Sequence, residues 1–182
     1  MQHSTSGARS HLVAAALVFA PLIAVGAAQA QTAAQQQAQA RAAQAKALLA
    51  KYTVDPGRRD TDGLLKEPAV RAELQRVVGG QLPKLMQNIN VRGDVDHYGG
   101  SLMVVGNAAH KGGEEEGVVC VNPYAPSLVE AGIFSKGKVT VFATADKYEY
   151  LTLCVKDWIT QVNSGHRDRF TQPKNVQVVR PK

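Results

Sequence analysis

The sequence predicts an α+β fold, in which an antiparallel β-sheet of about five strands packs against helices from both ends of the domain. Helical spacing of apolar residues occurs before residue 90, strand-like apolar runs fill the middle of the chain, and helical spacing returns from residue 151. Helices and strands in separate blocks favour an antiparallel sheet with helices packed on it. A chain of 182 residues is long enough for one such domain.

Two helices are expected ahead of the strands. Pro68 suits the first position of a helix, and apolar residues recur at helical spacing up to Val78, where Gly79-Gly80 ends the pattern. A second, shorter helix would span Leu82–Ile89, because its apolar side chains again fall on one face.

Four strand candidates follow, at Ser101–Gly106, Gly117–Val121, Val129–Phe134 and Lys138–Ala143. The last two are joined by Ser135-Lys136-Gly137, a short connection typical of a β-hairpin. A weaker candidate, Val176–Val179, lies in the polar and basic end of the chain. Together these segments predict the sheet of about five strands.

The most regular helical pattern lies after the strands. Apolar residues recur there at i, i+3, i+4, i+7, i+8 and i+11, namely Leu151, Cys154, Val155, Trp158, Ile159 and Val162. This face would turn Cys154 and Trp158 toward the sheet. We therefore expect Trp158 to be a core residue rather than a platform for a ligand.

The first residues, 1–30, have the pattern of a secretory signal peptide. Arg9 and His11 precede an apolar run that ends in Ala28-Gln29-Ala30, and cleavage is expected after Ala30. The most apolar part, Leu12–Val25, is shorter than the about 20 residues that span a bilayer. The sequence therefore predicts export to the periplasm and no membrane insertion.

The remaining chain divides into an Ala/Gln-rich spacer at residues 31–60, a folded domain at 61–165 and a basic tail at 166–182. The formal charge of the whole chain is +6, and loss of Arg9 with the signal peptide would leave +5. Arg167, Arg169 and Lys174 are not interleaved with aromatic residues that could stack on bases. No nucleic-acid partner is therefore expected.

Export also bears on the two cysteines, Cys120 and Cys154. In an oxidising compartment a disulfide between them can persist, and it would link the last helix to a central strand. Two free buried cysteines are the alternative. A cysteine nucleophile is not expected, because neither residue lies beside a histidine in a loop-like segment.

The segment 106–116 departs from these regular patterns. It is rich in glycine and glutamate, lies between two strand candidates and carries His110 near its centre. The chain lacks H-E-x-x-H, G-x-S-x-G and a phosphate-binding loop, so we expect no metal, no cofactor and no enzyme activity. A solvated hairpin loop with an incidental histidine stays open, as does a loop that binds a partner.

At these residues the chain resembles the inhibitor of vertebrate lysozyme (Ivy) family. The stretch Asn107-Ala108-Ala109-His110-Lys111-Gly112-Gly113 looks like the family's protruding C-K-P-H-D-C-G loop, and the order of helices and strands agrees over residues 64–160. Asn107 and Gly112 stand where that loop has its two cysteines, and Ala109 stands where it has a proline.

The resemblance implies an inhibitor that inserts this loop into the active-site cleft of a lysozyme or another peptidoglycan-cleaving muramidase. His110 is the residue that would meet the catalytic carboxylates, and an imidazole ring can hydrogen-bond to carboxylates. The resemblance implies that the partner-contacting residues are His110, Asn107, Ala108, Ala109, Lys111, Gly112 and Glu114. An envelope binding or immunity-type protein of the same fold is the alternative, and the sequence leaves open whether the protein forms a homodimer.

Overall fold

The structure is a computed structural model that describes residues 33, 35–36, 39–40, 42–44, 46–52, 60–98, 100–122, 124 and 128–181. The predicted signal peptide, residues 1–30, lies outside these described residues. Within them, no helix is both long enough and apolar enough to cross a membrane. The chain divides into one unit at Met1–Gln37 and a second at Ala38–Lys182, and the fold described below belongs to the second.

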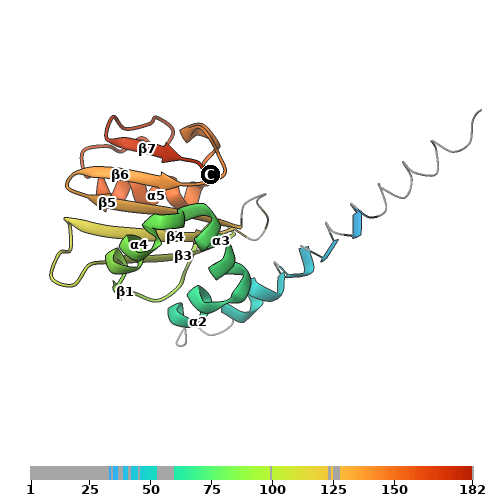
Figure 1. The fold of residues 1–182 in the computed structure, drawn as a ribbon. Helices are drawn as coiled ribbons and strands as arrows, with labels where there is room; N and C mark the ends of the chain where they lie inside the picture. Colours follow the sequence, from blue (N-terminus) through green and yellow to red (C-terminus); the bar gives the residue numbers. More distant parts are fainter. Residues whose placement is uncertain are drawn as a thin grey trace, which may run out of the picture. The chain divides into compact units, whose positions relative to one another are not determined.

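A mixed sheet organises this unit (Figure 1). Its strands are β1 (Val91–Arg92), β2 (Asp96–Tyr98), β3 (Ser101–Asn107), β4 (Glu115–Val121), β5 (Val129–Ser135), β6 (Lys138–Phe142) and β7 (Val176–Val179). They lie in the order β1-β3-β4-β5-β6-β7, and β2 also pairs with β3. All pairs are antiparallel except β6 with β7.

The predicted α+β class is confirmed, and β3 to β7 form at the predicted strand segments. The sheet also contains β1 and β2, which the sequence did not predict because they are very short and mostly exposed. The pairing of β7 differs from an all-antiparallel sheet. A helix intervenes between β6 and β7, and such a crossover returns the chain in the same direction.

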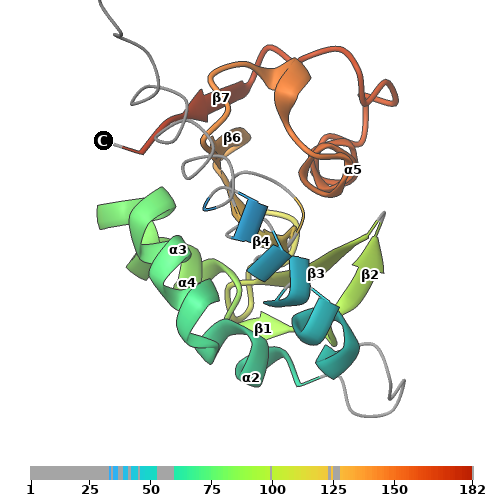
Figure 2. The ribbon, with the colours of Figure 1, turned by 90° about the vertical axis from the view of Figure 1, so that its right-hand side faces the viewer.

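Helices cover both faces of the sheet (Figure 2). On one face lie α2 (Thr61–Lys66), α3 (Pro68–Val78) and α4 (Leu82–Asn88), with the short 3-10 turn η1 (Gly79–Gln81) between the last two. On the other face lies α5 (Leu153–Val162), which follows the 3-10 turn η2 (Tyr148–Tyr150). Helices α3, α4 and α5 form where the sequence predicts them, whereas α2 is a single short helix without a long apolar pattern.

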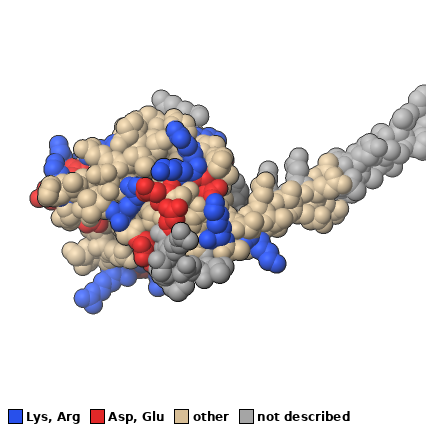
Figure 3. Space-filling view, turned by 90° about the horizontal axis from the view of Figure 1, so that it is seen from below, with Lys and Arg blue, Asp and Glu red and all other residues tan. Residues whose placement is uncertain are grey.

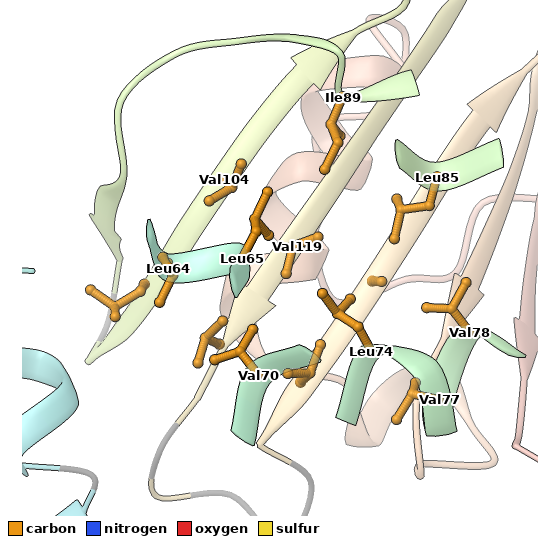
Figure 4. Close-up of a cluster of buried hydrophobic side chains, with 14 of the residues drawn as sticks. Leu64, Leu65, Val70, Leu74, Val77, Val78, Leu85, Ile89, Val104 and Val119 are labelled. Atoms are coloured by element: carbon orange, nitrogen blue, oxygen red, sulfur yellow. The ribbon is translucent and has the colours of Figure 1, made fainter. Parts of the chain in front are cut away.

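The first hydrophobic cluster fills the space between α2–α4 and the sheet (Figure 4). Leu64, Leu74 and Leu85 of the three helices meet Val104 and Val119, which lie on β3 and β4. Alternate side chains of a strand point to opposite faces, so the neighbouring positions on β3 and β4 face α5 instead.

The second cluster lies under α5 and centres on Trp158, which is fully buried. The indole ring lies against Gly132 of β5, where an added Cβ would come within 2.2 Å of a ring carbon. The predicted disulfide is present and joins Cys120 of β4 to Cys154 of α5. The alternative of two free cysteines is therefore wrong, and Trp158 is the core residue that its helical position predicts.

Residues from the regions predicted as a spacer and as a tail contact the domain. Tyr52, in the region predicted as a spacer, is 5% exposed and donates a hydrogen bond of 2.9 Å from its hydroxyl to Glu67 Oε1. In the region predicted as a basic tail, Arg169 forms a 3.0 Å ion pair with Asp157 of α5. The hydroxyl of Tyr148 donates to the Arg169 carbonyl. Parts of both segments therefore pack on the sheet and its helices.

Candidate functional site

The predicted partner-binding loop connects β3 to β4. Asn107, the last residue of β3, pairs with Glu116 of β4, and one step further the Ala108 amide donates to the Glu115 carbonyl at 2.9 Å. The strands therefore hold the two stems together up to Ala108 and Glu115. Strand β4 begins at Glu115, two residues earlier than predicted.

His110 lies in a tight turn at the start of the loop. The Lys111 amide donates to the Ala108 carbonyl at 3.0 Å, which closes a four-residue turn around Ala109 and His110. His110 has a positive φ of 61°, which the third position of a type II turn requires. The turn thus fixes the backbone that presents the imidazole ring.

A second turn follows directly. The amides of Glu114 and Glu115 both donate to the Lys111 carbonyl, at 3.1 and 3.0 Å. Gly113 has a φ of 83°, a conformation that glycine adopts readily, and its amide donates to Glu116 Oε1 at 2.8 Å. The loop is therefore closed by its own hydrogen bonds.

Asn107 and Gly112 face each other across this loop. A Cβ built on Gly112 would lie 3.8 Å from Asn107 Cγ, and Asn107 Nδ2 donates to the Ala108 carbonyl at 2.9 Å. The positions that hold cysteines in the resembling loop pattern are thus neighbours in space here, although neither is a cysteine.

Exposure differs among the predicted site residues. Ala109, His110, Lys111, Gly112 and Glu114 are exposed. Asn107 is half-buried, and Ala108 is only 5% exposed. The accessible surface of the loop is therefore the run from Ala109 to Glu114, with Ala108 serving in its stem.

Glu115 is a buried charged residue that sequence reasoning missed. Its side chain is 10% exposed and forms a 2.8 Å ion pair with Lys84 of α4. Ser135 Oγ donates to the other carboxylate oxygen, Oε1, at 2.8 Å, and Asn88 Nδ2 donates to Oε2 at 3.3 Å. The hydrogen bonds from Lys84 and Ser135 lower the pKa of Glu115 from 4.5 to about 2. In the sequence, Glu115 looked like one of three solvated glutamates, because the strand was expected to begin only at Gly117. The strand begins at Glu115 instead, and this residue is buried.

Four lysines lie at the same end of the sheet as the loop. Ser135 pairs with Glu115, so the β5–β6 turn at Lys136 and Gly137 lies beside the loop stem (Figure 1). Lys111, Lys136, Lys138 and Lys174 are exposed, and none forms an ion pair within the described ranges 60–98, 100–122 and 128–181. Unpaired cations make this end of the molecule suited to an acidic partner surface.

The lower face of the molecule differs in its charge pattern. Seen from below, Lys and Arg side chains border a cluster of Asp and Glu side chains (Figure 3). Asp62 of α2 forms ion pairs with Arg92 and with Lys66. A hollow of about 240 Å³ lies among α2, α3, α4 and β1. Its apolar lining is Leu65, Leu74, Leu82 and Met86, and its charged lining is Asp62, Lys66, Arg71 and Arg92. It contains none of the predicted site residues.

Metal-ligating side chains do not gather at the loop or elsewhere in the described residues. No group of three or more His, Cys, Asp or Glu side chains that could hold a metal ion occurs in the part of the chain that the structure describes. His110 is exposed, has exposed neighbours and lies in a hydrogen-bonded turn, so its ring is accessible.

One protein family matches this chain. The family model described as inhibitor of vertebrate lysozyme (Ivy) matches residues 69–164, which is more than half of the chain and includes the loop and the sheet from β1 to β6. Neither a curated protein nor a solved structure showed significant similarity. The chain therefore belongs to the inhibitor of vertebrate lysozyme family, a family of lysozyme inhibitors.

Proposed function

We propose that the protein is exported to the periplasm and inhibits a c-type or related lysozyme, or another peptidoglycan-cleaving muramidase, by inserting the His110 loop into the active-site cleft. One observation carries the proposal. An exposed histidine lies in a hydrogen-bonded turn that projects from the sheet, in a chain that belongs to a lysozyme-inhibitor family. The protein itself acts without catalysis.

The chemistry of the loop suits a cleft that contains carboxylates. The imidazole ring of His110 can hydrogen-bond to a carboxylate, and Lys111 beside it adds a positive charge. Occupation of the cleft by the loop would exclude the polysaccharide substrate. Since the turns already order the backbone, binding would cost less conformational entropy than it would for a flexible loop without such hydrogen bonds.

The charge around the loop bears on which muramidase is bound. Lys111, Lys136, Lys138 and Lys174 are unpaired among the described residues, and complementary charge raises association rates. We infer that the target has an acidic surface around its cleft. A test panel should therefore contain both acidic and basic muramidases.

The decisive experiment is inhibition of peptidoglycan lysis. Mature protein is titrated against each muramidase, and His110→Ala is compared with His97→Ala, which alters an exposed histidine on β2, away from the loop. We expect His110→Ala to weaken inhibition at least about tenfold, as residues at the centre of an interface do. His97→Ala should keep the wild-type potency, and both variants should keep the wild-type melting temperature.

Two results would contradict the proposal. In one, the wild-type protein inhibits no muramidase in the panel, which would favour an envelope partner of another kind. In the other, His110→Ala inhibits as strongly as the wild type, which would move the binding site away from the loop.

A further inference from the structure

We infer that Glu115 is the positioning residue that holds the His110 loop in its binding conformation, by connecting the loop stem to α4 and β5 through a buried carboxylate. The inference concerns loop order directly, and its effect on inhibition rests on the function proposed above. Glu115 is the first residue of β4 and directly follows the exposed run that ends at Glu114.

The backbone of Glu115 closes the loop from both sides. Its carbonyl accepts the Ala108 amide at 2.9 Å, and its amide donates to the Lys111 carbonyl at 3.0 Å. Ala108 and Lys111 are also the two ends of the turn that contains His110. A displacement of Glu115 would therefore disturb both ends of that turn.

The side chain of Glu115 joins this backbone to two other elements. Oε2 lies 2.8 Å from Lys84 Nζ and 3.3 Å from Asn88 Nδ2, both on α4, while Oε1 accepts from Ser135 Oγ at the end of β5. Asn88 is fully buried and also donates to the carbonyls of Glu116 and Phe134, which fixes the end of α4 against β4 and β5.

A buried carboxylate of this kind holds its position firmly. An ionised carboxylate is stable away from water only when charges and hydrogen-bond donors surround it, so moving it away from Lys84 and Ser135 is costly. The low pKa of Glu115 agrees with this, because it reports that the surrounding donors favour the ionised form. Glu114, the preceding residue, is exposed and lacks such contacts among the described residues.

The first test is amide hydrogen exchange by NMR on the full mature chain. Glu115→Gln keeps the side-chain size and removes the charge that Lys84 pairs with. We expect the amides of Lys111, Glu114 and Glu115 to exchange about tenfold faster, since hydrogen bonds to charged groups are the stronger ones. The matched control is Glu73→Gln on α3, which breaks a 2.6 Å ion pair with Arg76 far from the loop and should leave these amides unchanged.

The second test is rescue. In the Glu115→Gln background, Asn107→Cys with Gly112→Cys places two cysteines at facing positions, because a Cβ built on Gly112 would lie 3.8 Å from Asn107 Cγ. The new disulfide would order the loop without restoring the contact to Lys84. We expect it to restore slow exchange of the loop amides in the Glu115→Gln background, which is read by NMR and not by inhibition because Asn107 and Gly112 are themselves predicted partner contacts. Lys84→Met removes the same ion pair from the α4 side. It serves as the second variant if Glu115→Gln folds poorly, and it should also make the loop amides exchange faster.

The outcomes separate the two proposals. Unchanged loop exchange in both Glu115→Gln and Lys84→Met would overturn the role of Glu115. So would fast exchange of the loop amides that the disulfide does not slow in the Glu115→Gln background. A wild-type protein that inhibits no muramidase would end the proposed function, while the exchange experiment would still decide whether Glu115 orders the loop.

Discussion

Helix α5 and the His110 loop are attached to the same sheet by different kinds of contact. Helix α5 is joined to β4 by the Cys120–Cys154 disulfide, and Trp158 fills the space above Gly132. The loop has no covalent link and is held by hydrogen bonds and by Glu115. The covalent link thus serves the core of this protein, whereas the exposed loop depends on polar contacts that single substitutions can remove.

Two buried carboxylates show the same contrast in their electrostatics. Glu115 has Lys84 and Ser135 as partners, and its pKa is lowered to about 2. Glu130, which pairs across the strands with Cys120, accepts hydrogen bonds from the backbone amide and the hydroxyl of Thr152 at the start of α5. Burial raises the pKa of Glu130 because desolvation outweighs these donors. The folded protein therefore favours the ionised form of Glu115, whereas the ionised form of Glu130 carries a desolvation cost.

The largest effect on stability should come from removing the covalent link. Replacing Cys120 and Cys154 together by alanine frees a connection between residues 34 apart, and we expect a loss of about 3–4 kcal/mol in the free energy of unfolding. Urea denaturation measures it. Exchange of the His110 loop amides should stay at the wild-type rate well below the melting temperature. Faster loop exchange in this variant would show that the two regions are coupled.

A smaller effect should come from adding a covalent link to the loop of the otherwise wild-type protein. Asn107→Cys with Gly112→Cys should stabilise by about 2 kcal/mol, because the closed loop is short. Inhibition should tighten only a few-fold, since the turns already order the loop. The control is Asn107→Ser with Gly112→Ser under the same oxidising conditions, because a reductant would also break the Cys120–Cys154 disulfide. Equal stability of the cysteine and serine variants would contradict the close approach of the two positions.

The smallest effect should come from Glu130→Gln, with a change of no more than about 1 kcal/mol at neutral pH. Because folding raises the pKa of Glu130 above 4.5, its ionised form destabilises the folded state at higher pH, and the variant should gain relative stability as the pH rises above 4.5.

Glu115→Gln should show the opposite dependence. Its folded pKa is about 2, so the wild-type advantage is complete above 4.5 and disappears as the pH falls toward 2. Urea denaturation across this pH range compares them, and parallel curves for the two variants would contradict the contrast.

Much of the fold could be predicted from local pattern. Helix α3 begins at Pro68 and ends before Gly79, and α5 presents the predicted apolar face to the sheet. Strands β1 and β2 could not be predicted, because two and three residues carry no readable alternation. Their pairing with β3 supplies the hydrogen bonds that form them.

The sequence predicted where the candidate site lies along the chain, but not the contacts that hold it. Glycine content and the position between two strands located the loop around His110, and its exposure agrees with that position. Glu115 could not be separated from Glu114 and Glu116 by sequence alone. What distinguishes it is the approach of Lys84 and Ser135, which lie 31 and 20 residues away along the chain.

The sequence by itself determined the α+β class, the positions of the main helices and strands, and the loop that carries His110. Periodicity and turn residues act over a few neighbours, so a single chain segment contains that information. Only the tertiary structure decided that the sheet adds β7 in parallel, that Ala108 is buried, and that Glu115 rather than a disulfide holds the loop stem. These features depend on groups that are distant in the chain and meet only after the sheet and its helices have packed.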